Sequence, residues 1–199
     1  VGEIYFGGYS QYAKVNGDFL VKKPKELSSQ QSMVLGTAGL TALQCAFVAK
    51  LTREELLLGE KVQDVIVTGA SGGVGSIAVM ILSKLGCNVT VATSKNTNHE
   101  YLKSIGANNI INTSELMKDS RPLDKGLWDG AVDTVGGQVL ANVLSQTKET
   151  GIVATCGNAV DNKLNTTVMP FIIRGVKLWG INSVNISAVR RKFLWNEAS

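Results

Sequence analysis

The feature that most constrains the fold is the stretch 65–75, in which three apolar β-branched residues lead into four closely spaced glycines. Residues 65–67 predict a buried strand, and the glycines at 69, 72, 73 and 75 allow the backbone to turn sharply. Apolar residues then recur at helical spacing from Val74 to Leu85, and Gly86 follows where a left-handed residue commonly ends a helix. The sequence therefore predicts a strand, a glycine turn and an amphipathic helix in immediate succession.

A turn of this kind is suited to a pyrophosphate. A helix N-terminus points unpaired N–H groups and a positive dipole end at the space above the loop, and glycines let an anion approach closely. An ordinary strand–helix turn is the alternative, because glycine-rich loops are common. The strand before the loop, the helix after it and a second strand at 89–92 favour dinucleotide binding.

The rest of the chain alternates between strand and helix patterns. Further strands are expected at 109–111, 130–133, 152–155 and 176–180, with helices at 97–105 and around 139–144. This alternation predicts an α/β fold, a Rossmann doubly wound parallel sheet, which we assign to residues 28–199.

Residues 1–27 have a different pattern. Imperfect alternation over 5–15 and a short apolar run at 19–21 predict a hairpin, which we interpret as the tail end of an all-β domain. Ser28 and Ser29 then predict the start of a helix. The small residues at 36–42 fit close helix packing and the approach of a ligand equally well.

Composition excludes several classes of protein. The net charge of +4 comes from 20 basic and 16 acidic residues that are scattered, which argues against a nucleic-acid partner. Three distant cysteines and one histidine predict neither a structural zinc site nor a disulfide framework. We find no apolar run of membrane-span length and no signal peptide, so we expect a cytoplasmic protein with no membrane partner. The chain starts at Val1 and stops in a helical pattern, which suggests a fragment.

The end of the second strand bears on the cofactor. NAD-binding domains usually place Asp or Glu there to hold the ribose 2′-hydroxyl. This chain has Thr93, Ser94 and Lys95, which would attract a 2′-phosphate that a carboxylate would repel. NADP(H) is therefore favoured over NAD(H), with a merely solvated Lys95 as the alternative.

Three further residues could carry chemistry. Asp133 ends a strand, and its expected role is to cap the helix that begins near 136–137. Cys156 could be a nucleophile, but a small core residue near the nicotinamide is favoured. His99 falls near the adenosine end, where a catalytic role is not expected.

The segments 36–42 and 68–75 together resemble the medium-chain dehydrogenase/reductase superfamily. Segments 99–107, 133–136 and 166–174 narrow the resemblance to its zinc-independent quinone oxidoreductase branch, and most to the acryloyl-CoA reductase members. The likeness covers essentially the whole chain. It implies an NADPH-dependent reductase that gives hydride to the β-carbon of an activated C=C bond, such as acryloyl-CoA or a quinone or enone. It also implies a GroES-like catalytic domain, of which residues 1–27 would be the remnant, a Rossmann domain, and often a homodimer.

The resemblance also implies roles for individual residues. Ser71, Gly72, Gly73 and Val74 should face the pyrophosphate, and Thr93, Ser94 and Lys95 the 2′-phosphate. The residues expected around the nicotinamide half are Thr37, Thr41, Cys156, Gly157 and Asn158. Met33 and its neighbours offer no zinc ligand, in agreement with a zinc-independent enzyme. No catalytic side chain is assigned.

Two alternatives remain. Short-chain dehydrogenases have a similar glycine fingerprint, but they need a Tyr-x-x-x-Lys pair, which this sequence lacks. A protein that binds NADPH without catalysis would have the same fold, because fold does not fix function.

Overall fold

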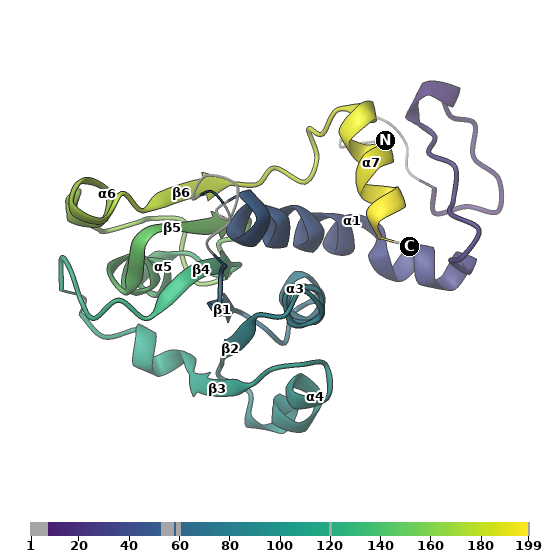
Figure 1. Ribbon diagram of the computed structural model, residues 1–199. Coiled ribbons are helices and arrows are strands. Elements are labelled where there is room, and N and C mark those ends of the chain that lie inside the picture. The colour runs from purple at the N-terminus through teal and green to yellow at the C-terminus, as the bar shows by residue number, and fades with distance from the viewer. Residues whose placement is uncertain (1–7, 53–57, 59–60, 120, 199) are drawn as a thin grey trace.

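The computed structural model describes residues 8–52, 58, 61–119 and 121–198, and contains a six-stranded sheet in the order β3-β2-β1-β4-β5-β6 (Figure 1). The strands are β1 (Asp64–Thr68), β2 (Asn88–Thr93), β3 (Asn109–Asn112), β4 (Trp128–Asp133), β5 (Thr147–Thr155) and β6 (Lys177–Gly180). Every neighbouring pair is parallel. The predicted Rossmann doubly wound sheet is therefore confirmed.

The strand order reverses at β1, which lies between β2 and β4. Chain progression runs from β1 outward to β3 on one side and from β4 outward to β6 on the other. In open parallel sheets a ligand binds beyond the carboxyl ends of the strands at such a switch point. The topology therefore places any ligand site next to the ends of β1 and β4.

Helices cover both faces of the sheet. The helices are α1 (Ser29–Ala46), α3 (Gly73–Lys84), α4 (His99–Ser104), α5 (Gly137–Ser145), α6 (Met169–Arg174) and α7 (Ala188–Glu197). Side chains of α1, α3 and α4 pack in one core cluster, and α5 contributes to a second cluster on the other face (Figure 1). Strand β1 shows the division, because Val65 and Val67 belong to the first cluster and Ile66 to the second.

Helix α1 begins as the sequence predicts. Ser28 Oγ accepts a hydrogen bond from the Gln31 N–H at 3.1 Å, and Gln31 Oε1 accepts one from the Ser28 N–H at 2.8 Å. This reciprocal pair is a capping box. The helix bends at Gly36, whose φ of 31° is in the left-handed region.

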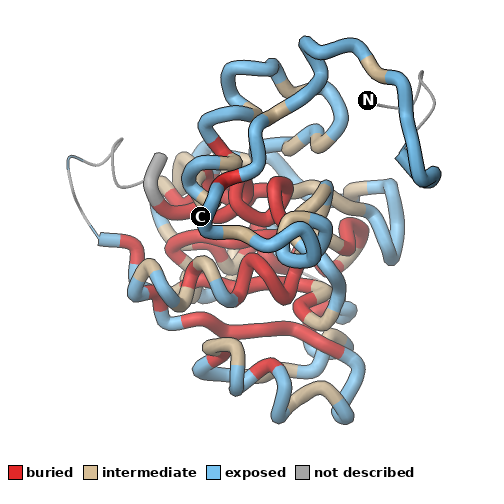
Figure 2. The backbone as a smooth tube through the Cα atoms, turned by 90° about the vertical axis from the view of Figure 1, so that its right-hand side faces the viewer, coloured by how far each residue is buried: buried red, intermediate tan, exposed pale blue. Residues whose placement is uncertain are grey.

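The second half of α1 corrects one sequence prediction. Residues Ser29–Lys50 are long and apolar enough to cross a membrane by length and composition, with a mean hydropathy of 1.5. Residues 39–46 are all buried, however, and Cys45 and Ala46 pack in the same core cluster as α3. Figure 2 shows the buried backbone gathered in the interior of the molecule. A helix that is apolar all round fits the core of a protein in the same way as a membrane.

The predicted N-terminal hairpin is not seen in the described part of residues 1–27. Residues 1–7 lie outside the described residues. From residue 8 to residue 28 the structure describes no strand, and Gly17–Phe19 forms a 3₁₀ turn capped by Asn16. Phe19 and Leu20 are exposed, so the apolar run at 19–21 has no neighbouring strand to bury it. The strand prediction for 19–21 is therefore wrong, and the domain boundary at 27/28 stays a prediction.

Candidate functional site

The tight loop between β1 and α3 requires glycine residues. Gly69 has a φ of 60°, and its carbonyl accepts a hydrogen bond from the Gly72 N–H at 2.9 Å. A Cβ on Gly75 would lie 2.4 Å from the Gly69 carbonyl oxygen and 2.7 Å from Ala70 Cα. Gly72 is the N-cap of α3 and has no side chain to cap the first turn. No side chain therefore caps the first turn of α3, which leaves its N–H groups open to an anion.

Helix α1 crosses this loop closely. A Cβ on Gly73 would lie 3.5 Å from Ala38 Cβ, so small residues on both sides bring the two helices together. Thr41 is buried, and its hydroxyl donates to the Thr37 carbonyl oxygen at 2.6 Å. Close helix packing, one of the two readings of segment 36–42, is therefore confirmed.

The end of β2 contributes side chains of two kinds. Thr93 is buried, and its hydroxyl accepts a hydrogen bond from the Lys95 N–H at 3.1 Å and lies 3.5 Å from Ser71 Oγ. Ser94 and Lys95 are exposed. Thr93 therefore fixes the loop, while Ser94 and Lys95 are the residues free to face a ligand beside the glycine loop.

A buried carboxylate ties together three strand ends. Asp133 Oδ1 accepts from Thr68 Oγ1 at 2.7 Å, and Oδ2 accepts from the Gly136 N–H at 3.0 Å and from Thr155 Oγ1 at 3.1 Å. Burial raises the pKa of the Asp133 carboxyl, and these hydrogen bonds oppose the shift. Gly136 is the N-cap residue of α5, so Asp133 holds the start of that helix, in agreement with its expected role.

Three of the residues predicted to lie near the nicotinamide follow the end of β5. A cavity of about 640 Å³ is lined by Thr155, Cys156, Gly157 and Asn158, together with residues 180–183 after β6. The structure thus brings together three of the five residues predicted for this half. Thr37 and Thr41 are not among the described residues that line this cavity. A Cβ on Gly157 would lie 2.3 Å from the Thr134 carbonyl oxygen, which explains the glycine there.

Sequence reasoning missed the hydroxyl partners of Asp133. Thr134 Oγ1 donates to the Thr68 carbonyl oxygen at 3.0 Å, and the Thr134 N–H donates to Thr68 Oγ1 at 3.2 Å. Thr68 is 65 residues away from Asp133, so no local pattern marks the contact. The signal that was available is the recurrence of Thr at the ends of β1, β2 and β5.

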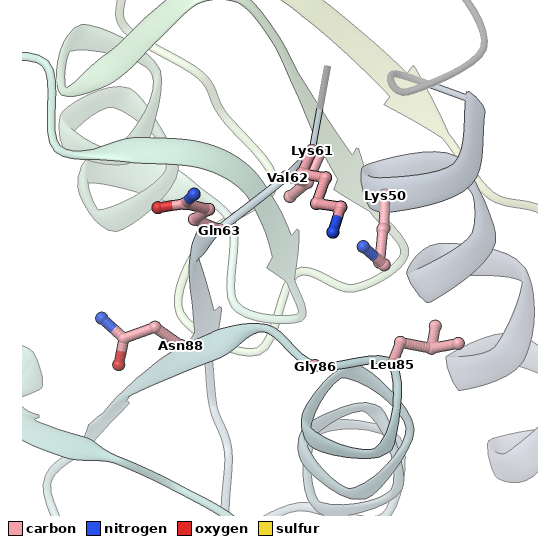
Figure 3. A pocket seen from close by; sticks show the side chains of 7 residues that line it. All are labelled: Lys50, Lys61, Val62, Gln63, Leu85, Gly86 and Asn88. Carbon is pink, nitrogen blue, oxygen red and sulfur yellow. The ribbon is translucent and has the colours of Figure 1, made fainter. Parts of the chain in front are cut away.

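A second cavity lies at the opposite end of the sheet. Its volume is about 470 Å³, and Figure 3 shows its lining residues, which are Lys50, Lys61, Val62, Gln63, Leu85, Gly86 and Asn88. Gln63 precedes β1 and Asn88 begins β2, so this cavity is at the amino ends of the strands. None of the predicted cofactor residues lies in it.

Zinc does not fit the described residues. Among them, no group of three or more His, Cys, Asp or Glu side chains could hold a metal ion. We therefore derive no chemical step through a metal. His99 is the first residue of α4, the helix that follows β2.

Known proteins are similar to this chain in sequence. Over 195 residues the chain is 46% identical to the probable acrylyl-CoA reductase AcuI of Escherichia coli strain K12, a match that covers 98% of this chain and 59% of that protein. It is 42% identical over 194 residues to the putative quinone oxidoreductase YhfP of Bacillus subtilis strain 168, covering 97% of this chain and 58% of that one. The chain thus spans a little under three fifths of the length of these curated relatives.

Solved structures are also similar to this chain, in both fold and sequence. The yhdH oxidoreductase of Salmonella enterica in complex with NADP matches with a TM-score of 0.90 and 48% identity, over 99% of this chain and 59% of that one. The Bacillus subtilis protein yhfP with NAD bound matches with a TM-score of 0.88 and 41% identity, over 97% of this chain and 58% of that one.

The family model described as zinc-binding dehydrogenase matches residues 73–196, from the first residue of α3 almost to the end of α7. That match covers more than half of the chain and agrees with the motifs at 36–42 and 68–75. The chain therefore belongs to the zinc-binding dehydrogenase family, within the medium-chain dehydrogenase/reductase superfamily.

Proposed function

We propose that this chain is the NADP(H)-binding part of a reductase that transfers hydride from NADPH to the β-carbon of an activated C=C bond. An enoyl thioester such as acryloyl-CoA is the first candidate substrate, and a quinone or enone is the second. The names of the relatives support both, since one is a probable acrylyl-CoA reductase and another a putative quinone oxidoreductase. Membership of the superfamily removes the short-chain alternative.

The proposal rests on the N-terminus of α3, which lies at the switch point of the sheet and has no side-chain cap. The end of β2 beside it lacks a carboxylate. Ser71, Gly72, Gly73 and Val74 would hold the pyrophosphate on the N-terminus of α3. The exposed Ser94 and Lys95 would meet the 2′-phosphate. NADP bound to the Salmonella relative supports this choice, while NAD bound to the Bacillus relative makes a direct comparison of the two cofactors necessary.

The nicotinamide half would lie over Cys156, Gly157 and Asn158, in the cavity of about 640 Å³. NADPH, when bound, supplies the hydride, and the protein supplies orientation and electrostatics. Here the chain holds the floor of the cavity in place, because the Cys156 N–H donates to the Asp133 carbonyl oxygen at 3.0 Å. Thr37 and Thr41 stay predicted neighbours of the nicotinamide, supplied by α1.

The test is turnover by the full-length protein. NADPH mixed with acryloyl-CoA should lose its nicotinamide absorbance, and the thioester product should be saturated. Benzoquinone and a simple enone serve as the comparison substrates. If NADPH binds but is not consumed with the thioester, quinones or enones, the proposal fails. The alternative, a protein that binds NADPH without catalysis, would then be favoured.

The remaining expectations concern the whole protein. We propose a homodimer in the cytoplasm, without a nucleic-acid or membrane partner. Light scattering of the full-length protein would give the mass that tests the dimer.

A further inference from the structure

A smaller cavity adjoins the cavity of about 640 Å³ that we predict to hold the nicotinamide. Its volume is about 270 Å³, and it lies between α1, the residues that follow β6 and the start of α7. Gly180, Ile181 and Asn182 line both cavities, so the two spaces meet at the carboxyl end of β6. The described residues that line this side cavity include none of those predicted to bind the cofactor. It is therefore open to a different ligand, or to a different part of the substrate.

Amide groups make up much of the polar wall of the side cavity. The polar lining residues are Gln44, Asn182, Asn185, Ser187 and Arg190. Trp179, Ile181 and Ile186 supply the apolar part. Asn182 Oδ1 accepts hydrogen bonds from the Val184 N–H at 2.8 Å and the Asn185 N–H at 3.0 Å, which fixes the turn before α7. The wall suits a ligand that is itself rich in amide groups and has apolar links between them.

Gln44 is the lining residue that points most directly to a ligand. Its side chain reaches the side cavity from α1, although the residue is only 4% exposed. The Gln44 Nε2 donates to the Leu40 carbonyl oxygen at 3.3 Å within the same helix. Among the residues that the structure describes, none donates to Gln44 Oε1. Buried polar atoms nearly always have a hydrogen-bond partner, because a buried acceptor without one loses its hydration. An N–H donor of a ligand in the side cavity would satisfy this oxygen.

The side cavity also lies in a part of the protein that lacks negative charge. Segments 27–50 and 162–196 supply its lining residues and contain no Asp or Glu, although the chain has 16 acidic residues. Arg190 lines the cavity from the first turn of α7, and no carboxylate in the described ranges pairs with it. Ser187 caps this helix of 10 residues, whose N-terminus adds the positive end of a dipole. A guanidinium at such a position favours a phosphate group.

We propose that the side cavity is the subsite for the phosphopantetheine arm of a coenzyme A thioester. This inference rests on the proposed function, because it takes the acyl group to lie in the adjoining nicotinamide cavity. From the thioester sulfur outward, the arm has amide groups first and phosphates last. The lining has the same order, since Asn182 borders the nicotinamide cavity whereas Arg190 lines the side cavity alone. An arm amide N–H meets Gln44 Oε1, and a phosphate meets Arg190.

The first experiment measures binding without turnover. Calorimetric titration of the full-length protein, saturated with NADP⁺, gives the Kd of free coenzyme A. Arg190→Ala should weaken that binding by at least about tenfold and leave the Kd of NADPH unchanged. Pantetheine, which has the amides and no phosphate, should bind wild type and Arg190→Ala equally.

The matched control is Lys192→Ala, which removes the same charge from an exposed position on α7 that does not line the side cavity. It should leave the Kd of coenzyme A unchanged. Equal coenzyme A binding by wild type and Arg190→Ala would overturn the proposal, as would an equal loss in Lys192→Ala. A matching loss of NADPH affinity in Arg190→Ala would also overturn it, since the guanidinium would then belong to the cofactor site.

Gln44→Met tests the buried amide. Methionine has a similar length and no amide oxygen, so pantetheine and coenzyme A should both bind several-fold more weakly. The thermal midpoint of the free protein should stay equal to that of wild type or rise, because an acceptor without a donor has been removed. A lower midpoint with unchanged binding of both ligands would show that Gln44 only supports α1, and would overturn its assigned contact. Should this variant fail to fold, the titrations of Arg190→Ala and Lys192→Ala still decide the proposal.

Kinetics separate this inference from the proposed function. In Arg190→Ala the KM for acryloyl-CoA should rise at least about tenfold more than the KM for a simple enone, because only the thioester has the arm. Turnover of acryloyl-CoA with the same KM in wild type and Arg190→Ala would remove the subsite and leave the reductase. Coenzyme A binding that depends on Arg190, without turnover of any substrate, would remove the reductase and leave the subsite.

Discussion

At the scale of the residue, Lys95 is the side chain that we propose to distinguish NADPH from NADH. Lys95→Glu places a carboxylate at the exposed end of β2 beside the glycine loop. Repulsion of a 2′-phosphate should weaken NADPH binding by at least about tenfold more than NADH binding, a difference of about 1.4 kcal/mol. Fluorescence titration of both cofactors measures it.

The matched control for that variant is Lys84→Glu, an equal charge change at the last residue of α3, the end remote from the glycine loop. It should leave the ratio of the two Kd values unchanged. Equal weakening of NADPH and NADH by Lys95→Glu would show that this lysine does not contact the 2′-phosphate.

Asp133 gives a prediction for stability against pH. Its folded pKa is raised above the ordinary value of 3.8, so the folded state binds more protons than the unfolded state in the window that opens above that value. The free energy of unfolding therefore falls as pH rises through this window and levels off above the folded pKa. Asp133→Asn removes the titration and should flatten this fall, as urea unfolding between about pH 4 and 8 would measure.

The same change has a cost at every pH. An Asn amide cannot accept from all of Thr68, Gly136 and Thr155, so we expect a loss of roughly 1–3 kcal/mol. Asp161→Asn, at an exposed carboxylate, is the control and should change neither quantity much. An unaltered pH slope in Asp133→Asn would contradict the raised pKa.

The sequence indicated the roles of some site residues and missed the contacts of others. The sequence indicated Asp133 as the support of a helix start, because a local motif, strand–Asp–glycine turn, marks it. It did not indicate that Thr68 donates to this carboxylate, since the two residues are 65 positions apart in the sequence. Thr93 stays a predicted neighbour of the 2′-phosphate, and its hydroxyl also accepts the Lys95 N–H within the loop.

At the scale of the element, the glycine loop and α3 give the sharpest packing prediction. Alanine is favoured over glycine by about 1 kcal/mol within a helix. At Gly75, however, the added Cβ would meet the Gly69 carbonyl oxygen at 2.4 Å. Gly75→Ala should therefore lower the free energy of unfolding by roughly 1–3 kcal/mol and weaken NADPH binding.

The control is Gly17→Ala, because a Cβ on Gly17, outside the candidate site, would meet nothing within 4 Å. Urea midpoints and NADPH titrations of the two variants give the comparison. A Gly75→Ala variant as stable as the wild type would mean that the loop is not closed as tightly as the structure has it.

Elements that rely on local pattern were predicted well, and elements that need a distant partner were not. α3 and the strands β1 to β4 and β6 begin and end within two residues of their predicted ranges, whereas β5 begins at Thr147, five residues before its predicted start. The apolar run at 19–21 had the right composition for a strand, but a strand forms only beside another strand. The sequence did not indicate how long the apolar helix α1 is, because Gly36 bends the helix and does not end it.

At the scale of the whole molecule, cofactor binding should stabilise the fold. The candidate site draws on the ends of β1, β2, β4 and β5, so a ligand held there bridges strands that separate on unfolding. A ligand that binds the folded state alone adds about 2.7 kcal/mol at one hundred times its Kd. We expect NADP⁺ to raise the thermal midpoint of the full-length protein more than NAD⁺ at equal concentration, as differential scanning fluorimetry would measure. A larger shift with NAD⁺ would contradict the cofactor assignment.

The carboxylate of Asp133 links the two halves of the candidate dinucleotide site. Thr68 leads into the glycine loop proposed to hold the pyrophosphate, Thr155 leads into the residues proposed to lie under the nicotinamide, and both hydroxyls donate to Asp133. We expect a displacement of either loop to shift this shared carboxylate and, with it, the other loop. A substitution of Asp133 should therefore change the affinities for both mononucleotide fragments of the cofactor in the same direction.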